Sequence, residues 1–157
     1  MGTKKGFSSG QILTTMGGII SIISIFLPWF HATSATSSLS VNGLFSASGS
    51  GMLLRLVGEN SNWGFQGLGV LALGIVSIAA SLILRDKIRS SAMIACGILI
   101  IGGGVVNLWS LRDIGLFSGS IFGEVIQAGV GYGLYAVVIG GIVTAAGGLI
   151  EWRDLTK

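Results

Sequence analysis

The sequence is poor in charge and in the residues from which most chemical sites are built. Of its 157 residues only 10% are charged, and cysteine, proline and histidine each occur once. A single cysteine excludes a disulfide within the chain, and a zinc-type centre lacks the several His and Cys ligands that it needs. The 51% of hydrophobic residues and the mean hydropathy of +0.85 leave too little polar surface to cover a soluble globule. The composition therefore predicts an integral membrane protein.

Four segments of about 20 residues are apolar and free of charge, which is the length a helix needs to cross a bilayer. The sequence predicts an all-α, antiparallel four-helix transmembrane bundle, with residues 1–157 as one domain. The predicted helices are 11–30, 65–84, 91–111 and 131–150, and the predicted outer loops are 31–64 and 112–130.

The basic residues are dispersed at the ends of the apolar runs, with no basic stripe that carries aromatics, so we expect no nucleic-acid partner. Seven of the nine fall on one side of the predicted helices, and only Arg55 and Arg112 fall on the other. By the positive-inside rule the N- and C-termini are cytoplasmic. The expected setting is the cell membrane, with the lipid bilayer as the first partner.

The first outer loop carries a hairpin signal. Two short runs rich in β-forming residues flank Asn42-Gly43, a pair that favours a type I′ turn because both positions accept a positive φ. We expect a small extracellular β-hairpin there, followed by a short amphipathic segment over 49–60 that caps the bundle or lies on the membrane. The loop 112–130 has too many apolar residues to stay free, so it is expected to bury them.

Small residues at four-residue spacing mark the predicted helices. In lipid, helices associate through close packing, which Gly, Ala, Ser and Thr permit. The sequence supports packing within the chain and leaves self-association open. The candidate packing or interface residues are Gly17, Ser21, Gly103, Asn107, Ala136, Gly140, Thr144 and Gly148, with the Asn107 amide expected to form a hydrogen bond across the bundle.

The four tryptophans, Trp29, Trp63, Trp109 and Trp152, are predicted to anchor the helices at the membrane interfaces. Pro28 is expected in the last turn of the first helix, where it would kink the chain as it leaves the bilayer. His31 follows directly, and a lone interfacial imidazole is most simply a hydrated polar residue.

The sequence shows no arrangement typical of catalysis. Asp113 and Glu124 are the outer-loop carboxylates of the second loop, and no base lies beside a Ser, Cys or Thr at a recognisable spacing. No Asp, Glu, Lys, Arg or His falls within the four predicted helices, which removes the usual markers of proton and ion pathways. We therefore expect no enzyme activity and no catalytic, cofactor-binding or metal-binding residue.

The order of "FLPWF", "NGLF" and "GVGYGLYAVVIGGIVTAAGGLIEWR" resembles small uncharacterised four-helix membrane proteins of bacteria and archaea. A fainter resemblance is to the claudin and peripheral-myelin-protein superfamily, where Trp29 and Gly43-Leu44-Phe45 occupy the places of its loop motif. This chain lacks the two loop cysteines of that family. The resemblance implies a tetraspan fold and, for claudins, an adhesion or barrier role.

The sequence thus predicts a non-enzymatic structural or accessory subunit, or a lateral assembly unit, of a membrane complex. Its partners would be further copies of itself or other membrane subunits. The alternatives are a small channel or carrier with an uncharged pathway and a claudin-like adhesion or barrier protein, since abundant glycine serves either kind of protein.

Overall fold

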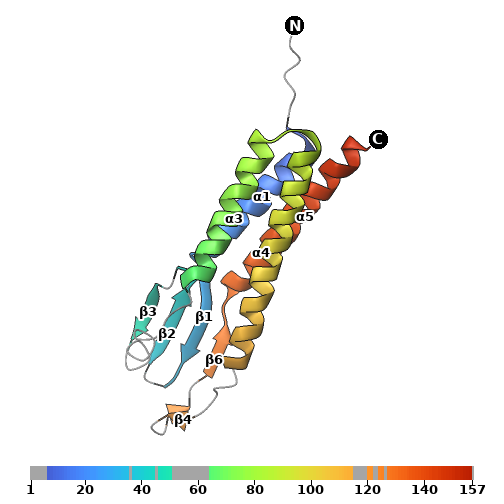
Figure 1. The fold of residues 1–157 in the computed structure, drawn as a ribbon. Helices are drawn as coiled ribbons and strands as arrows, with labels where there is room; N and C mark the ends of the chain where they lie inside the picture. The colour runs from blue at the N-terminus through green and yellow to red at the C-terminus, as the bar shows by residue number, and fades with distance from the viewer. Residues whose placement is uncertain are drawn as a thin grey trace.

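The structure is a computed structural model, which describes residues 7–35, 37–44, 46–50, 64–114, 120–121, 124–125 and 127–156. These residues form a mostly helical protein with a small antiparallel sheet at one end of a helical bundle (Figure 1). The helices are α1 (Ser9–Ser24), α3 (Gly64–Ile83), α4 (Asp86–Ile114) and α5 (Tyr132–Leu155). The strands are β1 (Pro28–Thr33), β2 (Ser38–Asn42), β3 (Ala47–Ser50), β4 (Ser120–Ile121), β5 (Glu124–Val125) and β6 (Gln127–Val130).

Helix α1 begins at a capping box and ends earlier than the apolar run predicts. The Ser8 hydroxyl accepts from the Gln11 N–H, and the Gln11 side chain accepts from the Ser8 N–H. The helix ends at Ser24, and the predicted continuation to residue 30 is wrong. Pro28 disfavours the helical conformation at the residue before it and cannot donate a hydrogen bond, so it opens strand β1 instead of kinking a helix.

The two long connections meet in one sheet of strand order β3-β2-β1-β6. Strand β1 pairs antiparallel with β2 on one side and with β6 on the other, where Phe30 lies opposite Val130. Strand β6 was not predicted, because its sequence QAGV has little β propensity of its own. The sheet joins the segments after α1 and before α5, and it places them at the same end of the bundle (Figure 1).

The hairpin between β2 and β3 is confirmed, but its predicted turn type is wrong. Val41 pairs with Ala47, so the connection is longer than the two residues of a type I′ turn. Gly43 also does not adopt a positive φ. The Asn42 Oδ1 atom instead accepts from the N–H groups of Leu44, at 3.1 Å, and Ser46, at 2.9 Å. Asn42 therefore shapes the turn through its side chain.

Helix α5 lies between α1 and α4 and uses two glycine doublets to reach both. A Cβ on Gly140 would lie 2.9 Å from the Gly17 carbonyl of α1, and one on Gly141 would lie 2.9 Å from the Ile101 N of α4. Seven residues later the second doublet repeats the arrangement, with Gly147 against α1 and Gly148 against α4. Adjacent residues point about 100° apart on a helix, so each doublet supplies one close contact to each neighbour.

The small residues at four-residue spacing on the fourth helix do not all face the same neighbour. Gly140 and Thr144 face α1, whereas Gly148 faces α4, with its hypothetical Cβ 2.8 Å from the Ile94 N. Eight residues turn a helix by about 800°, so Gly148 is displaced by about 80° from Gly140. Gly17 and Ser21 meet this surface from α1, and Ala136 is half-buried. Gly140 and Thr144 of α5 therefore pack against Gly17 and Ser21 of α1, and Gly148 packs against α4. All five residues are used for packing within the chain.

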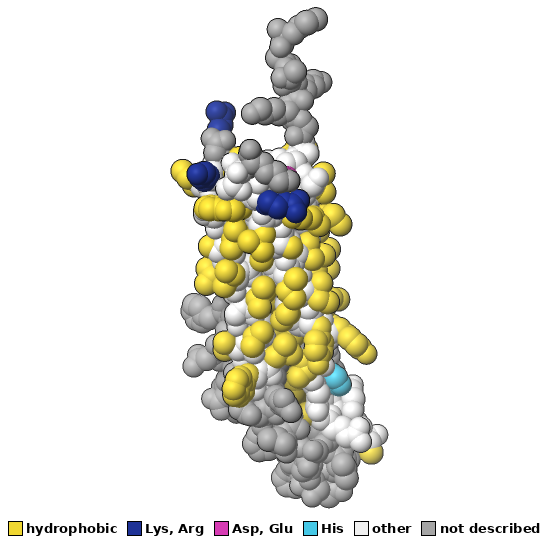
Figure 2. Space-filling model, turned by 90° about the vertical axis from the view of Figure 1, so that its right-hand side faces the viewer, with side chains coloured by type: hydrophobic (Ala, Val, Ile, Leu, Met, Phe, Trp, Pro, Cys, Tyr) yellow, Lys and Arg dark blue, Asp and Glu magenta, His cyan; other side chains and the backbone are white. Residues whose placement is uncertain are grey.

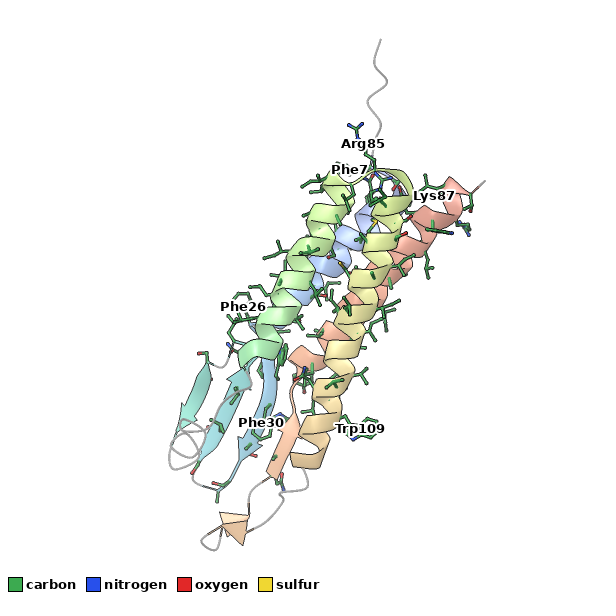
Figure 3. The ribbon with its side chains drawn as sticks, viewed as in Figure 1. Phe7, Phe26, Phe30, Arg85, Lys87 and Trp109 are labelled. Atoms are coloured by element: carbon green, nitrogen blue, oxygen red, sulfur yellow. The ribbon has the colours of Figure 1, made fainter. Side chains whose placement is uncertain are left out.

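Large hydrophobic side chains cover the outside of the bundle (Figure 2). Two helices are long and apolar enough to cross a membrane, over Lys87–Trp109 and Tyr132–Leu155, and the apolar helices over Ser9–Ser24 and Gly67–Ile83 are shorter. Arg85 and Lys87 lie at the end of the bundle opposite the sheet, near the two termini (Figure 3). The surface is thus divided into a basic end, an apolar middle and a sheet end.

Candidate assembly site

A groove of about 250 Å³ runs between α3 and α4 in the half of the bundle nearer the sheet. Its α4 side is formed by Leu99, Gly102, Gly103, Val106 and Asn107, and its α3 side by Gly69, Val70 and Leu73. The α4 residues follow the three- and four-residue spacing of one helical face. The groove is therefore a continuous strip of α4 beside a short strip of α3.

Three glycines that line this groove face open space, unlike the glycines at the contacts between helices in the described part of the chain. A Cβ on Gly69, Gly102 or Gly103 would have no atom within 4 Å, whereas each other glycine described has a neighbour that such a Cβ would meet. In the rest of the bundle, glycine is where two backbones approach each other. Along the groove, the same kind of surface has no neighbour among the described residues.

Asn107 lies at the end of the groove and is only 5% exposed. Its Nδ2 donates to the Gly103 carbonyl of the same helix at 2.7 Å, so the predicted hydrogen bond across the bundle is wrong. An amide side chain on a helix can reach the carbonyl four residues earlier, which satisfies one of its two N–H groups. Asn107 lines the groove, and no described residue donates a hydrogen bond to its Oδ1 atom.

The tryptophans occupy different environments. Trp109 is 72% exposed on α4, beyond Asn107, and Trp152 is partly exposed near the basic end; these positions suit anchors at two interfaces. Trp63 lies outside the described residues. Trp29 is only 6% exposed, and its interfacial role is wrong: its Nε1–H donates to the Ser24 carbonyl at 2.9 Å.

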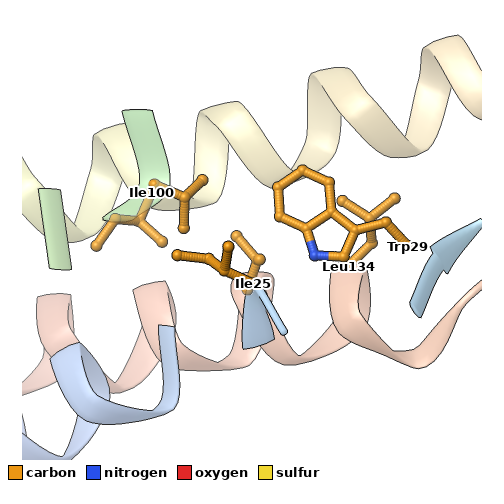
Figure 4. Packing of buried hydrophobic residues seen from close by; sticks show 6 residues of the cluster. Ile25, Trp29, Ile100 and Leu134 are labelled. Atoms are coloured by element: carbon orange, nitrogen blue, oxygen red, sulfur yellow. The ribbon is translucent and has the colours of Figure 1, made fainter. Parts of the chain in front are cut away.

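A β-bulge explains why Trp29 points inward. The register between β1 and β2 slips between Pro28 and Phe30, which leaves Trp29 as the extra residue, and a bulge redirects the side chain it carries. The indole packs with Ile25, Ile100 and Leu134 in the buried cluster beneath the sheet (Figure 4). A Cβ on Gly43 would lie 2.7 Å from the indole, so this glycine makes room for Trp29. Trp29 therefore joins the sheet to the bundle.

An ion pair at the basic end was not anticipated from the sequence. Glu151 of α5 is 4% exposed and accepts from the Arg89 guanidinium of α4 and from the Ser8 hydroxyl at the start of α1. The Arg89 Nε atom is buried and has no hydrogen-bond partner among the described residues. Residues 89 and 151 lie just outside the predicted helices 91–111 and 131–150, and the sequence alone assigned no contact to either. Their position one turn inside the true helix ends was the missed signal.

The remaining candidates for chemistry stay apart from one another in the structure. His31 is exposed on β1, and Cys96 is a buried free thiol on α4. Within the described residues, no three of the His, Cys, Asp and Glu side chains form a group that could hold a metal ion. Of the predicted amphipathic segment 49–60, Gly49 and Ser50 belong to strand β3, and residues 51–60 lie outside the described part. The side chains of Asp113 and Glu124 also lie outside it.

Sequence reasoning named Gly103 and Asn107 as packing or interface residues and expected the Asn107 amide to bond across the bundle. It missed Gly69, Leu99 and Val106, because the spacing of small and large residues does not show which helix face stays unpartnered. Comparison with protein-family models and with curated proteins finds no match for this chain.

Proposed function

We propose that this chain is a non-enzymatic, multi-pass membrane protein that acts as a lateral assembly unit, through the groove between α3 and α4. The open glycines of that groove are the observation that carries the proposal. In lipid, a glycine surface contributes to stability only when another backbone packs against it, because glycine has no side chain to contact acyl chains.

The apolar outer surface supports placement in a bilayer. Isoleucines and leucines that are about half exposed occur on all four helices, for example Ile19, Ile75, Leu99 and Ile142. A soluble monomer rarely exposes contiguous apolar patches of this extent. We propose that all four helices cross the membrane, with α1 lengthened by the turn at Ile25–Leu27, and that the basic end with both termini is cytoplasmic.

Leucine substitutions at Gly102 and Gly140 distinguish an intermolecular interface from an internal packing surface. Leucine at Gly102 meets no described atom within 4 Å of its Cβ, so we expect the monomer to fold at least as well as the wild type. Leucine also favours the helix over glycine by up to about 1 kcal/mol. Leucine at Gly140 should instead prevent correct folding, because its Cβ would collide with the α1 backbone.

The test is purification in mild detergent followed by measurement of the mass of the protein without its detergent. We expect an assembly for the wild type, its loss for Gly102→Leu with a monomer that still folds, and no effect of Ile142→Leu on the exposed face of α5. A wild-type protein that is inserted in the membrane but always monomeric would refute the assembly role.

A further inference from the structure

We infer that the partner of the groove is a second copy of this chain, bound in a two-fold symmetric dimer in which the two Asn107 side chains pair. This inference rests on the proposed assembly role and names its partner. It draws on two independent properties of the groove: its shape and the hydrogen-bonding groups that Asn107 leaves unused.

The groove carries both the depressions and the projections of a self-complementary surface. Gly102 and Gly103 form a depression on α4, and Gly69 extends it onto α3. Leu99 and Val106 stand on the same face of α4 on either side of this depression, and they are 58% and 59% exposed. A two-fold interface requires that one patch carry both knobs and holes, since each copy presents the same surface. A side chain from one copy can then enter the glycine depression of the other.

The Asn107 amide is also self-complementary. A primary amide has two N–H donors and one carbonyl acceptor, and one of these donors is used by the Gly103 carbonyl. One N–H and the Oδ1 atom therefore remain for a partner. Two such amides related by a two-fold axis can each donate to the other's Oδ1, which satisfies both. An acyl chain offers no donor, and a single asparagine is known to fix helix association in apolar surroundings.

The topology allows this arrangement in a bilayer. Two copies inserted in the same orientation are related by an axis along the membrane normal, so their Asn107 residues lie at the same depth. Trp109 follows Asn107 by two residues and is 72% exposed, which places the amide pair just inside the sheet-side interface. The dimer thereby brings the α3–α4 faces together and leaves the opposite surfaces to lipid.

Crosslinking in native membranes tests which partner occupies the groove. In a Cys96→Ala background, Val106→Cys treated with a short bis-methanethiosulfonate should give a product of twice the 16.1 kDa chain mass. Ile142→Cys, equally lipid-facing on α5, is the matched control and should give none. Tagged and untagged copies should co-purify in the crosslinked product, which identifies it as a homodimer.

A second measurement tests the amide pair. Energy transfer between labelled copies in liposomes, followed as the protein-to-lipid ratio falls, gives the dimer dissociation constant. We expect Asn107→Leu to raise this constant about tenfold, as for two interhelical hydrogen bonds of typical strength. Asn107→Gln keeps the amide and should remain within about threefold of the wild type. An unchanged constant for Asn107→Leu would overturn the amide pairing.

The outcomes separate this inference from the proposed function. If Val106→Cys crosslinks only to a different membrane protein, the homodimer is refuted and the assembly role stands. If it crosslinks to nothing and the wild type is monomeric in native membranes, both are refuted, and lipid fills the groove. If Ile142→Cys crosslinks copies while Val106→Cys does not, copies associate through another face, and the inference is likewise refuted.

Discussion

The buried ion pair between Glu151 and Arg89 should contribute strongly to folding when one partner alone is removed. The Glu151 side chain is 5% exposed and the Arg89 side chain 18% exposed, so neither has the surroundings of a surface charge. Removing one member of a buried pair leaves the other charge uncompensated, at a cost of about 3–5 kcal/mol. Arg89 retains some access to water, so we expect Glu151→Met to lie near about 3 kcal/mol.

The double variant Glu151→Met, Arg89→Met gives the decisive comparison. Both replacements are unbranched and apolar, and replacing a whole buried pair in this way is often neutral or stabilising. We expect the double variant to unfold with a free energy within about 1 kcal/mol of the wild type, so the coupling energy exceeds the cost of either single change. The same variant also removes the buried Arg89 Nε atom, for which the described residues offer no hydrogen-bond partner.

The assay is reversible unfolding in bicelles, by steric trapping or by denaturant, for the wild type, both single variants and the double variant. Thr15→Val provides a control, since it removes the hydrogen bond between the Thr15 hydroxyl of α1 and the Ser81 hydroxyl of α3 near the same end, and Thr15 forms no hydrogen bond with Arg89 or Glu151. Single variants that cost less than about 1 kcal/mol, or a double variant whose loss equals the sum of the single losses, would refute a coupled buried pair.

Three further changes test other parts of the fold. Trp29→Phe should cost about 0.5–1.5 kcal/mol in thermal unfolding, because it removes the indole hydrogen bond while the Ser24 carbonyl still accepts from the Leu27 N–H; an unchanged stability would mean that the indole bond contributes nothing. Asn42→Ala should lower stability by about 1–2 kcal/mol, because two backbone N–H groups lose their acceptor. An unchanged stability would mean that the backbone alone determines the turn. For orientation, Ser38→Cys should react with an impermeant maleimide from outside intact cells and Lys87→Cys should not, both in a background without the native thiol; the opposite pattern would invert the topology.

The apolar runs and the small-residue spacing predicted much of the helical part. Three of the four predicted helices begin and end within a few residues of α3, α4 and α5, because a long apolar segment between polar turns has few alternatives to a helix. Helix α1 was predicted to continue through Pro28 because hydropathy carries no information about backbone donors. The hairpin was found from Asn42-Gly43, although the reason for Gly43 is the Trp29 indole above it.

Other features depend on contacts between residues that are far apart in the sequence. Strand β6 forms because the free edge of β1 is available for pairing. The residues of β6 have little β propensity of their own. Glu151 and Arg89 become one buried site only because α4 and α5 lie side by side. The sequence by itself determined the apolar helices, the distribution of charge and the supply of glycine. Only the tertiary structure decided which glycines face a neighbouring helix and which remain open, because helical rotation divides one small-residue pattern among several faces.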